Sequence, residues 1–380
     1  MQYNWYKILA GTAVVLIAGA SVLFLKYKVP DNFTLPPIYR MEEEPQPKIT
    51  KLFFAGDIML SRNVGTKIYE ANDPLLPYKN IREWVLNADI AFANLESPFN
   101  NEGARITQGL IFKAEPGSIT GLKDSGFDIL STANNHTMDQ GIGGLNFTMN
   151  WLKSNGIDYI GTGSDCHDGL IKETNGIKFG YLAYSYTAYN DGGKIPDPLV
   201  CNWTDSKQIS ADIMLLKPMV DFLIVSSHMG VEYKRSPEQS NASGARTAID
   251  AGADLFIGHH PHWIQTIEEY RGKYIFYSLG NFVFDQMWSQ DTTEGLSIEV
   301  LFKDKNLSRI TLLPVVIENF CCPRPATDTE TKSILGKINP QASTFLLVEN
   351  GQTTTSWKAA LSNKGSLIAP DKLDNSAIVE

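Results

Sequence analysis

Short runs of apolar residues recur between residues 50 and 280, and most are followed at once by polar side chains. Near-continuous apolar runs of this length are typical of strands in a sheet that is covered on both faces. We expect six such strands, at residues 51–55, 89–93, 127–131, 222–225, 255–257 and 274–277. Helix-like segments separate most of them, at 81–86, 119–124, 145–153 and 242–251. Strands that alternate with helices predict an α/β fold.

The pattern changes after residue 296. Residues 296–302 and 309–316 alternate between apolar and polar side chains, as half-exposed antiparallel strands do. Residues 327–338 are expected to form a helix, since Thr327 and Glu330 have the spacing of a capping box. Residues 345–348 precede Asn350-Gly351, which favours a hairpin, and the chain from about residue 362 is expected to be loosely ordered. We therefore expect a domain over 49–320 and a C-terminal helix and hairpin extension over 321–380.

The N-terminus carries a long uncharged segment. Residues 8–25 form an 18-residue apolar run, which as a helix would span about 27 Å, close to the thickness of a bilayer's hydrocarbon core. A cleaved signal peptide is the alternative, but the run continues beyond the small residues at 18–20, which favours an uncleaved anchor over residues 1–28. The Pro-rich residues 29–48 read as a linker. We expect a single-pass protein of the cell membrane with its folded domain outside the cell.

Charge and cysteine content narrow the function. The net charge of −9 argues against non-specific nucleic-acid binding, although a bound metal could still attract an anionic substrate. The four cysteines lack a CxxC spacing and are too few for a disulfide scaffold in a chain of this size. Cys321 and Cys322 could pair with other cysteines or remain thiols.

Polar side chains gather where the predicted strands end, and three of the six histidines of the chain lie within residues 259–262. Sites in α/β sheets form just beyond the carboxyl ends of the strands. Carboxylate, amide and imidazole ligands without a thiolate suit Mn, Fe or Zn. The set is larger than one tetrahedral ion requires, and two ions bridged by a carboxylate could clamp the oxygens of a phosphoester. The residues concerned are Asp57, Glu96, Asn135, His136, His228, His259, His260 and His262.

Each of these residues also has a simpler interpretation. Asp57 follows Gly56 and could be a turn residue, and Asn135 could cap the next helix. His228 could be a hydrogen-bonded core histidine, and His167 reads as a loop residue. The joint occurrence at the strand ends favours the metal site.

The order of these motifs resembles the calcineurin-like metallophosphatases and, more narrowly, the CapA family of poly-γ-glutamate capsule biosynthesis proteins. The resemblance covers roughly residues 50–330, and its motifs are residues 56–59, 94–98, 133–141, 227–233, 258–262 and 277–285. It implies a four-layer αββα sandwich. It also implies that His136 is a general acid and that one or two divalent ions are bound by Asp57, Glu96, Asn135, His228, His260 and His262.

Two details of the resemblance concern the ligand set. The adjacent histidines at 259 and 260 leave the register of that motif open by one residue. Where the wider superfamily has Asp-x-His on the first strand, this chain has Asp57-Ile58-Met59, so one metal position lacks a ligand.

Three functions remain open from the sequence. The first is a membrane-anchored extracellular protein of poly-γ-glutamate synthesis or export, with synthase subunits as candidate partners. The alternative is a metal-dependent phosphoesterase that acts on a phosphorylated envelope or signalling compound, and the third is a scaffold that recruits membrane partners. Three further residues could contact an anionic polymer or a phosphoester, namely Arg62, Lys113 and Glu232. Alternatively, they lie on a solvated face and contact no substrate.

Overall fold

The computed structural model describes residues 46–186, 199–203, 205–338, 345–349 and 352–353. The predicted anchor, almost all of the linker and the predicted loose tail lie outside these residues. Within them, no helix is both long and apolar enough to cross a bilayer.

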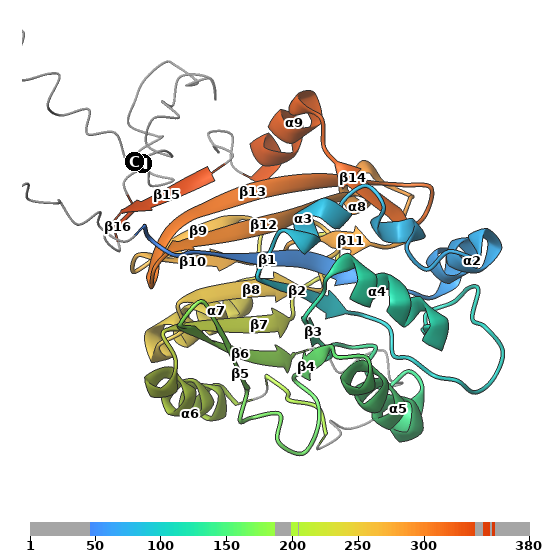
Figure 1. Cartoon of the computed structure of the whole chain (residues 1–380), viewed down its shortest axis with the longest axis horizontal. Helices are drawn as coiled ribbons and strands as arrows, with labels where there is room; N and C mark the ends of the chain where they lie inside the picture. The colour runs from blue at the N-terminus through green and yellow to red at the C-terminus, as the bar shows by residue number, and fades with distance from the viewer. Residues whose placement is uncertain (1–45, 187–198, 204, 339–344, 350–351, 354–380) are drawn as a thin grey trace, which may run out of the picture. The chain divides into compact units, whose positions relative to one another are not determined.

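The first sheet combines a parallel half with an antiparallel half (Figure 1). Its parallel strands are β1 (Ile49–Ile58), β2 (Ile90–Leu95), β3 (Ile129–Ser131) and β4 (Asp158–Ile160). On the other side of β1 come the antiparallel strands β12 (Glu294–Lys303), β13 (Asn306–Glu318), β15 (Phe345–Glu349) and β16 (Gln352–Thr353). The short strands β11 (Asn281–Val283) and β14 (Cys322–Pro325) pair with β1 and β13.

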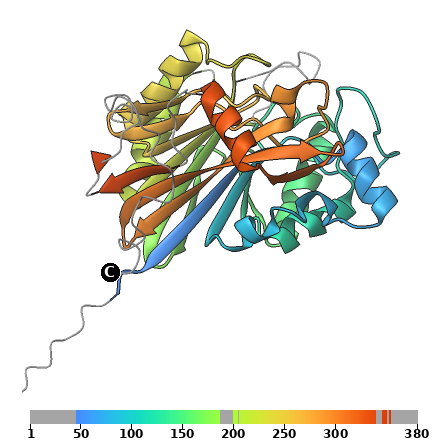
Figure 2. The same cartoon turned by 90° about the horizontal axis from the view of Figure 1, so that it is seen from above.

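Among the described residues, the second sheet has six strands, and four of them run parallel at its centre. These four are β6 (Ile177–Ser185), β7 (Phe222–His228), β8 (Leu255–His259) and β10 (Lys273–Phe276). Antiparallel strands form its two edges, namely β5 (Leu170–Thr174) and β9 (Ile267–Tyr270). Seen from above in Figure 2, the strands fan out, as expected from the twist of such sheets.

Successive side chains of β1 point to opposite faces of the first sheet and so join different hydrophobic clusters. Phe54 packs between the two sheets, in a cluster that includes Ile224 of β7 and Phe302 of β12. Phe53 packs on the outer face, in a cluster that includes residues of the nearby helices. The ring of Phe302 meets Phe222 of β7 edge to face at 5.0 Å, so the two sheets are in direct contact.

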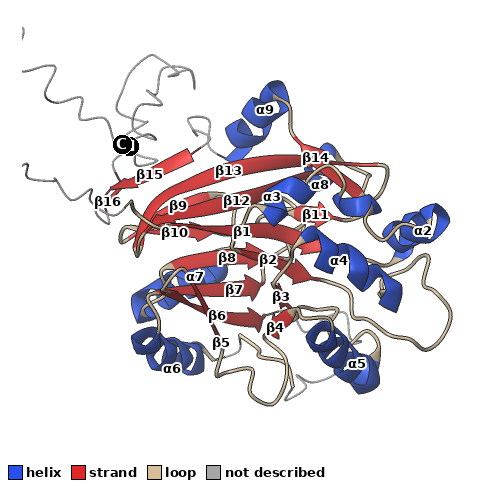
Figure 3. Ribbon diagram, in the orientation of Figure 1, coloured by secondary structure: helices blue, strands red, loops and turns tan. Residues whose placement is uncertain are grey.

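Helices cover the outer face of each sheet (Figure 3). Those on the first sheet are α2 (Arg62–Ala71), α3 (Arg82–Leu86), α4 (Ile119–Ser125) and α5 (Gly141–Ser154). Those on the second sheet are α6 (Ser206–Leu216) and α7 (Gln239–Ala251). The short helix α8 (Gln290–Thr293) leads into β12. Two packed sheets between two helical layers make the four-layer αββα arrangement that the sequence predicted.

Strand β14 and the helix that follows it pack against the elements described above. Strand β14 pairs with β13, and helix α9 (Asp328–Ile338) buries Ile334 and Leu335 in the cluster between the sheets. The expected capping box of α9 is present, since Glu330 Oε2 accepts a 2.8 Å hydrogen bond from the Thr327 amide.

Candidate metal centre

The polar residues predicted at the strand ends come together in one buried cluster. Each of them is at most 7% exposed, so the cluster is enclosed by protein. They come from the ends of β1 (Asp57), β7 (His228) and β8 (His259), and from the loops after β2 (Glu96), β3 (Asn135, His136) and β8 (His260, His262).

Glycines precede two of these residues because the backbone packs very closely there. A Cβ atom on Gly56 would lie 2.0 Å from the carbonyl oxygen of Gly280, and one on Gly258 would lie 2.0 Å from that of Tyr277. Only glycine fits at such separations. The glycines of the Gly-Asp and Gly-His motifs therefore let β1 and β8 approach the chain at residues 277–280.

Asp57 is held by amide and imidazole groups. Its Oδ1 accepts a 2.8 Å hydrogen bond from Asn94 and lies 3.1 Å from His259 Nδ1, and its Oδ2 lies 3.9 Å from His262 Nδ1. Burial on its own raises the pKa of Asp57, but the neighbouring His259, together with His262, lowers it overall. Asp57 is thus kept as a carboxylate.

Glu96 is a fully buried carboxyl group that lies among three imidazoles. Its Oε1 lies 3.7 Å from His136 Nε2, 3.9 Å from His228 Nε2 and 4.0 Å from His262 Nε2. Within the described part of the chain, neither of its carboxylate oxygens has a hydrogen-bond partner. Burial, and next the negative charge of Asp57, raise its pKa well above the ordinary value. A carboxylate in this position needs a cation, because buried charges are paired or bind metals.

His228 and His260 are neutral imidazoles that face one another. His228 Nε2 lies 2.7 Å from Asn135 Oδ1 and 3.1 Å from His260 Nδ1. Burial lowers the pKa of His228 well below its ordinary value and that of His260 to about 3. The neutral form is the one that ligates metals.

His262 presents one nitrogen to Glu96 because Asn281 binds the other. His262 Nδ1 lies 2.9 Å from Asn281 Oδ1, and the Asn281 amide group donates to the Thr292 carbonyl oxygen at 2.9 Å. The ring is thereby oriented with Nε2 towards the carboxylates. His260 and His262 have positive φ angles, 96° and 58°, in a region that non-glycine residues rarely adopt and that often marks functional sites.

The three histidines of the turn make different contacts within the cluster. His260 contacts His228 and His262 contacts Glu96, whereas His259 lies against Asp57 and near the ring of Phe92. All three imidazoles thus contact members of the cluster, and the choice of His260 and His262 as ligands stays a prediction.

His136 lies beside the cluster with a partner of its own. Its Nδ1 is 2.7 Å from Asp139 Oδ2, and its ring stacks on Phe112 at 3.8 Å between centroids. This arrangement directs Nε2 to Glu96 and suits a group that holds or donates a proton.

The donor set fits a divalent ion. Ligand atoms of Asp57, Glu96 and His228 lie within 4.8 Å of one another, and neither carboxylate oxygen of Glu96 has a hydrogen-bond partner among the described residues. The donors are oxygen and imidazole nitrogen, as Mn, Fe and Zn accept. Met59, at the position of the missing histidine, is buried in the outer core, and its sulfur accepts from the Ser61 amide at 3.1 Å.

The three residues expected to contact a substrate differ in their surroundings. The guanidinium of Arg62 pairs with Asp285 and lies 4.6 Å from the centre of the Phe112 ring. Lys113 is buried, with Nζ bound to the carbonyl oxygens at 102 and 103, so it is not on the solvated face that was the alternative. Glu232 is half-buried, and its Oε1 lies 4.0 Å from His262 Nε2. Substrate contact remains a prediction for all three.

Three functional residues were not singled out from the sequence, although all lie within its motifs. Asn94 donates to Asp57, Asp139 binds His136, and Asn281 orients His262. Their position in the sequence could have identified them, because each lies at the end of a strand or in the segment that directly follows one.

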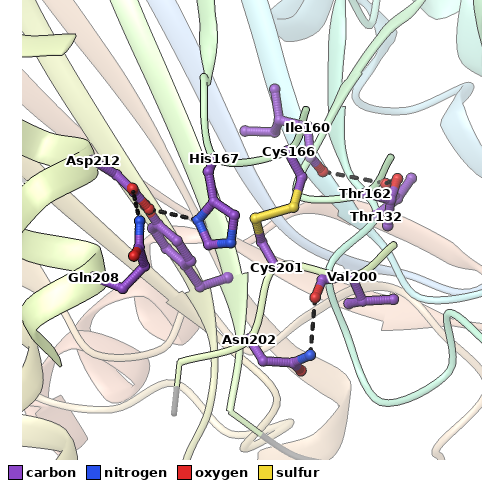
Figure 4. Close-up of a disulfide and its surroundings, with 11 residues drawn as sticks. Thr132, Ile160, Thr162, Cys166, His167, Val200, Cys201, Asn202, Gln208 and Asp212 are labelled. Atoms are coloured by element: carbon purple, nitrogen blue, oxygen red, sulfur yellow. Dashed lines mark hydrogen bonds and ion pairs between the residues drawn. A yellow bond between two sulfur atoms is a disulfide. The ribbon is translucent and has the colours of Figure 1, made fainter. Parts of the chain in front are cut away.

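All four cysteines form disulfides, which the sequence had left open. Cys166 pairs with Cys201, and the adjacent Cys321 and Cys322 pair with each other. Figure 4 shows His167 beside the first disulfide, with its ring bound to Asp212. His167 lies in a turn, as predicted.

Comparisons with known proteins agree with the motifs. The chain is 29% identical over 338 residues to the capsule biosynthesis protein CapA of Bacillus anthracis, covering 84% of this chain and 79% of that one. It is 29% identical over 315 residues to the PGA biosynthesis protein CapA of Bacillus subtilis, covering 79% and 80%. Among solved structures it is similar to a 5′-nucleotidase precursor from Thermus thermophilus, at 13% identity and a TM-score of 0.45, covering 77% and 59%. The last similarity is too distant to bear on function.

The family described as Bacterial capsule synthesis protein PGA_cap matches residues 51–286. This match covers more than half of the chain and confirms the resemblance to the CapA family that the motifs indicated. The chain therefore belongs to the PGA_cap family of bacterial capsule synthesis proteins.

Proposed function

We propose that this chain is a membrane-anchored extracellular protein that takes part in the synthesis or export of poly-γ-glutamate capsule polymer, using a metal-binding cleft. Family membership over residues 51–286 and the two Bacillus relatives, named for capsule and PGA biosynthesis, support the process. The candidate partners are synthase subunits in the membrane and the anionic polymer itself.

The observation that carries the metal-binding cleft is the buried carboxylate of Glu96 among three imidazoles. Asp57, Glu96 and His228 would hold an ion, and Asn135, His260 and His262 lie next to them. A divalent ion bound here would supply positive charge for an anionic substrate and lower the pKa of a bound water. The ligands would hold the ion, and Asp139 would keep Nε2 of His136 directed towards Glu96.

An extracellular location has separate support in the cysteines. The disulfide between Cys166 and Cys201 suits an oxidising compartment, because thiols are kept reduced in the cytosol. The apolar run at residues 8–25 would supply the anchor, although it lies outside the described residues.

Deletion and complementation in a strain that makes surface polymer test this function. Deleting the gene should abolish the polymer, and the wild-type gene should restore it. Genes carrying Asp57→Ala or His262→Ala should fail to restore it if the metal site is needed. Unchanged polymer after deletion would rule out the proposed role, whereas full rescue by both variants would favour a scaffold without metal chemistry.

A second candidate is a metal-dependent phosphoesterase, and the pairing of His136 with Asp139 beside the cluster favours it. The pair could protonate a leaving oxygen. Purified full-length protein loaded with Mn, Fe or Zn should then hydrolyse a generic phosphodiester, and His136→Ala should abolish turnover. Lack of hydrolysis with every one of these metals would eliminate this candidate.

A further inference from the structure

His167 lies beside the disulfide between Cys166 and Cys201, in the turn at residues 164–168. A ring nitrogen of His167 and the two sulfur atoms all lie within 4.8 Å of one another. Figure 4 shows the His167 ring between this disulfide and the carboxylate of Asp212. Two sulfur atoms and an imidazole nitrogen are thus gathered in one place, and none of them belongs to the strand-end cluster.

A buried carboxylate fixes the orientation of this imidazole. His167 Nδ1 lies 2.7 Å from Asp212 Oδ2, and the same oxygen accepts a 2.9 Å hydrogen bond from the Tyr184 hydroxyl. Gln208 donates to the other oxygen, Oδ1, at 2.7 Å. Asp212 itself is only 3% exposed. Because a carboxylate accepts hydrogen bonds, Nδ1 of the neutral ring carries the hydrogen and Nε2 presents a lone pair.

This pairing is the one that metal-binding histidines make. In metal sites the ring nitrogen that points away from the ion usually donates to a carboxylate or carbonyl group, which fixes the ring and makes it a stronger ligand. The alternative is a simple surface ion pair. The His167 side chain is 44% exposed, and such pairs contribute little to stability. A buried carboxylate held by two other side chains is better explained by a ring that has to stay in place.

The two cysteines are also held by backbone hydrogen bonds, which do not require the bond between their sulfurs. The Cys201 amide donates to the Gly161 carbonyl oxygen at 2.9 Å, and the Cys201 carbonyl oxygen accepts from the Ser185 amide at 2.8 Å. The Cys166 amide donates to the Gly163 carbonyl oxygen at 3.4 Å. The two Cα atoms are 5.9 Å apart. Two thiolates on a tetrahedral ion, each about 2.3 Å from it, lie about 3.8 Å from one another. Side-chain rotation supplies this separation, so a reduced pair can share an ion over the present backbone.

We infer that Cys166, Cys201 and His167 bind one Zn²⁺ ion when the disulfide is reduced, with Asp212 as the residue that positions His167. Two thiolates and one imidazole suit zinc, and water would take the fourth position on the exposed side of His167. The sulfurs cannot bind the ion while they are bonded to each other, so the disulfide and the zinc form are alternative states of one site. The inference does not depend on the proposed function, because the strand-end cluster contains no thiolate.

Reduction requires an external thiol, and a cavity gives it access to Cys166. This cavity of about 240 Å³ is lined by Cys166 and by the exposed Lys153 and Asp165, so it opens to solvent. Two thiol molecules supply two electrons and two protons. The S–S bond breaks, both cysteines become thiols, and the external pair leaves as its own disulfide. Zinc then displaces the two protons. Reoxidation by a disulfide of the same external thiol reverses both steps and releases the ion.

Cobalt uptake tests the inference, because Co²⁺ bound to thiolates has a charge-transfer absorption that Co²⁺ on oxygen and nitrogen ligands lacks. Full-length protein in detergent would carry C321S and C322S, so that Cys166 and Cys201 are its only cysteines. It would be reduced with dithiothreitol and freed of the reagent under nitrogen. The reduced protein should take up one Co²⁺ per chain with this absorption, and Zn²⁺ should displace it. The oxidised protein should show no such absorption.

Variants identify the third ligand and the residue that positions it. D212N should weaken Zn²⁺ binding at this site by about 10–100-fold, as outer-sphere changes do, and H167A should weaken it further. H167C, which places a third thiolate there, should restore tight binding, whereas a merely structural histidine could not be replaced in this way. D168N, exposed and adjacent to His167, is the matched control and should behave as wild type.

The inference is overturned if the reduced protein lacks the charge-transfer absorption, or if H167A keeps the wild-type affinity for Zn²⁺. Wild-type affinity in D212N would overturn the positioning role of Asp212. Circular dichroism of the oxidised variants checks their fold before reduction. If D212N fails this check, H167A and H167C carry the test, because position 167 is exposed and tolerates substitution.

Discussion

His136 and Asp139 form a hydrogen-bonded pair whose geometry fixes where the imidazole points. His136 Nδ1 lies 2.7 Å from Asp139 Oδ2, and Nε2 lies 3.7 Å from Glu96 Oε1. Phe112 stacks on the ring, and its amide donates to the same carboxylate oxygen of Asp139 at 2.6 Å. One carboxylate thus holds both the ring and the aromatic residue that covers it.

If the cleft hydrolyses phosphoesters, His136→Ala should lower turnover by roughly 10²–10⁴-fold, the usual contribution of a general acid. Metal content should stay unchanged, because His136 is placed beside the ligands rather than among them. Asp139→Asn should lower turnover less. The His136 ring would still have a hydrogen-bonding neighbour at position 139, but that neighbour would no longer carry a negative charge. Turnover and metal content of the full-length protein measure both effects. His167→Ala, which removes the ring bound to Asp212, serves as the control. If His136→Ala instead lost metal, His136 would be a metal ligand rather than a general acid beside the ligands.

Asn281→Ala should weaken metal binding although Asn281 is not a ligand. Without its oxygen, His262 loses the group that fixes its tautomer and orientation, and such outer-sphere changes typically cost about 10–100-fold in affinity. Competition with a chelating dye would measure the change. Asn306→Ala, at the exposed start of β13, should have no effect. Equal affinity for Asn281→Ala and wild type would show that His262 is held by other contacts.

The fold was largely predictable because its strands coincide with apolar runs. All six predicted strands are present, but β6 (Ile177–Ser185) was missed although it lies at the centre of the second sheet. Gly180 interrupts its apolar pattern, and a Cβ atom there would lie 2.9 Å from a methyl group of Leu223, so a larger residue would displace that side chain. This close approach comes from the neighbouring strand, and the sequence does not reveal which strands are neighbours.

The site was predictable as a set of residues but not as a set of contacts. Parallel strands bring their carboxyl ends to one edge, so Asp57, Glu96 and His228 could be grouped in advance. That Glu96 lacks a hydrogen-bond partner among the described residues, and that Asn281 orients His262, depends on packing between the two sheets. The disulfide of Cys166 with Cys201 depends likewise on which loops meet.

Removing the disulfide between Cys166 and Cys201 should destabilise the domain more than removing the one between Cys321 and Cys322. The first closes a loop with a sequence separation of 35, and the second joins adjacent residues. A cross-link stabilises mainly by restricting the unfolded chain, so a double change to serine at 166 and 201 should cost about 2–4 kcal/mol. Thermal unfolding of both double-serine variants measures the difference. A larger loss from the vicinal pair would contradict the expected ranking.

Glu96→Gln should stabilise the metal-free protein at pH 8 while abolishing its stabilisation by metal. Burial raises the pKa of Glu96 in the folded state, so above the ordinary value of 4.5 the unfolded chain loses this proton first. Wild-type stability is therefore lost as pH rises towards and through the folded pKa, and glutamine, which does not titrate, avoids that loss. In chelator, the advantage of the variant in free energy of unfolding should grow from pH 5 to pH 8 and reach about 1–3 kcal/mol, the cost of an unpaired buried polar group. In Mn²⁺ at about 100 times its Kd, wild type should gain about 2.7 kcal/mol and the variant nothing, which reverses the order. A difference in Tm that does not change with pH would mean that Glu96 is not the buried, cation-requiring group of the cluster.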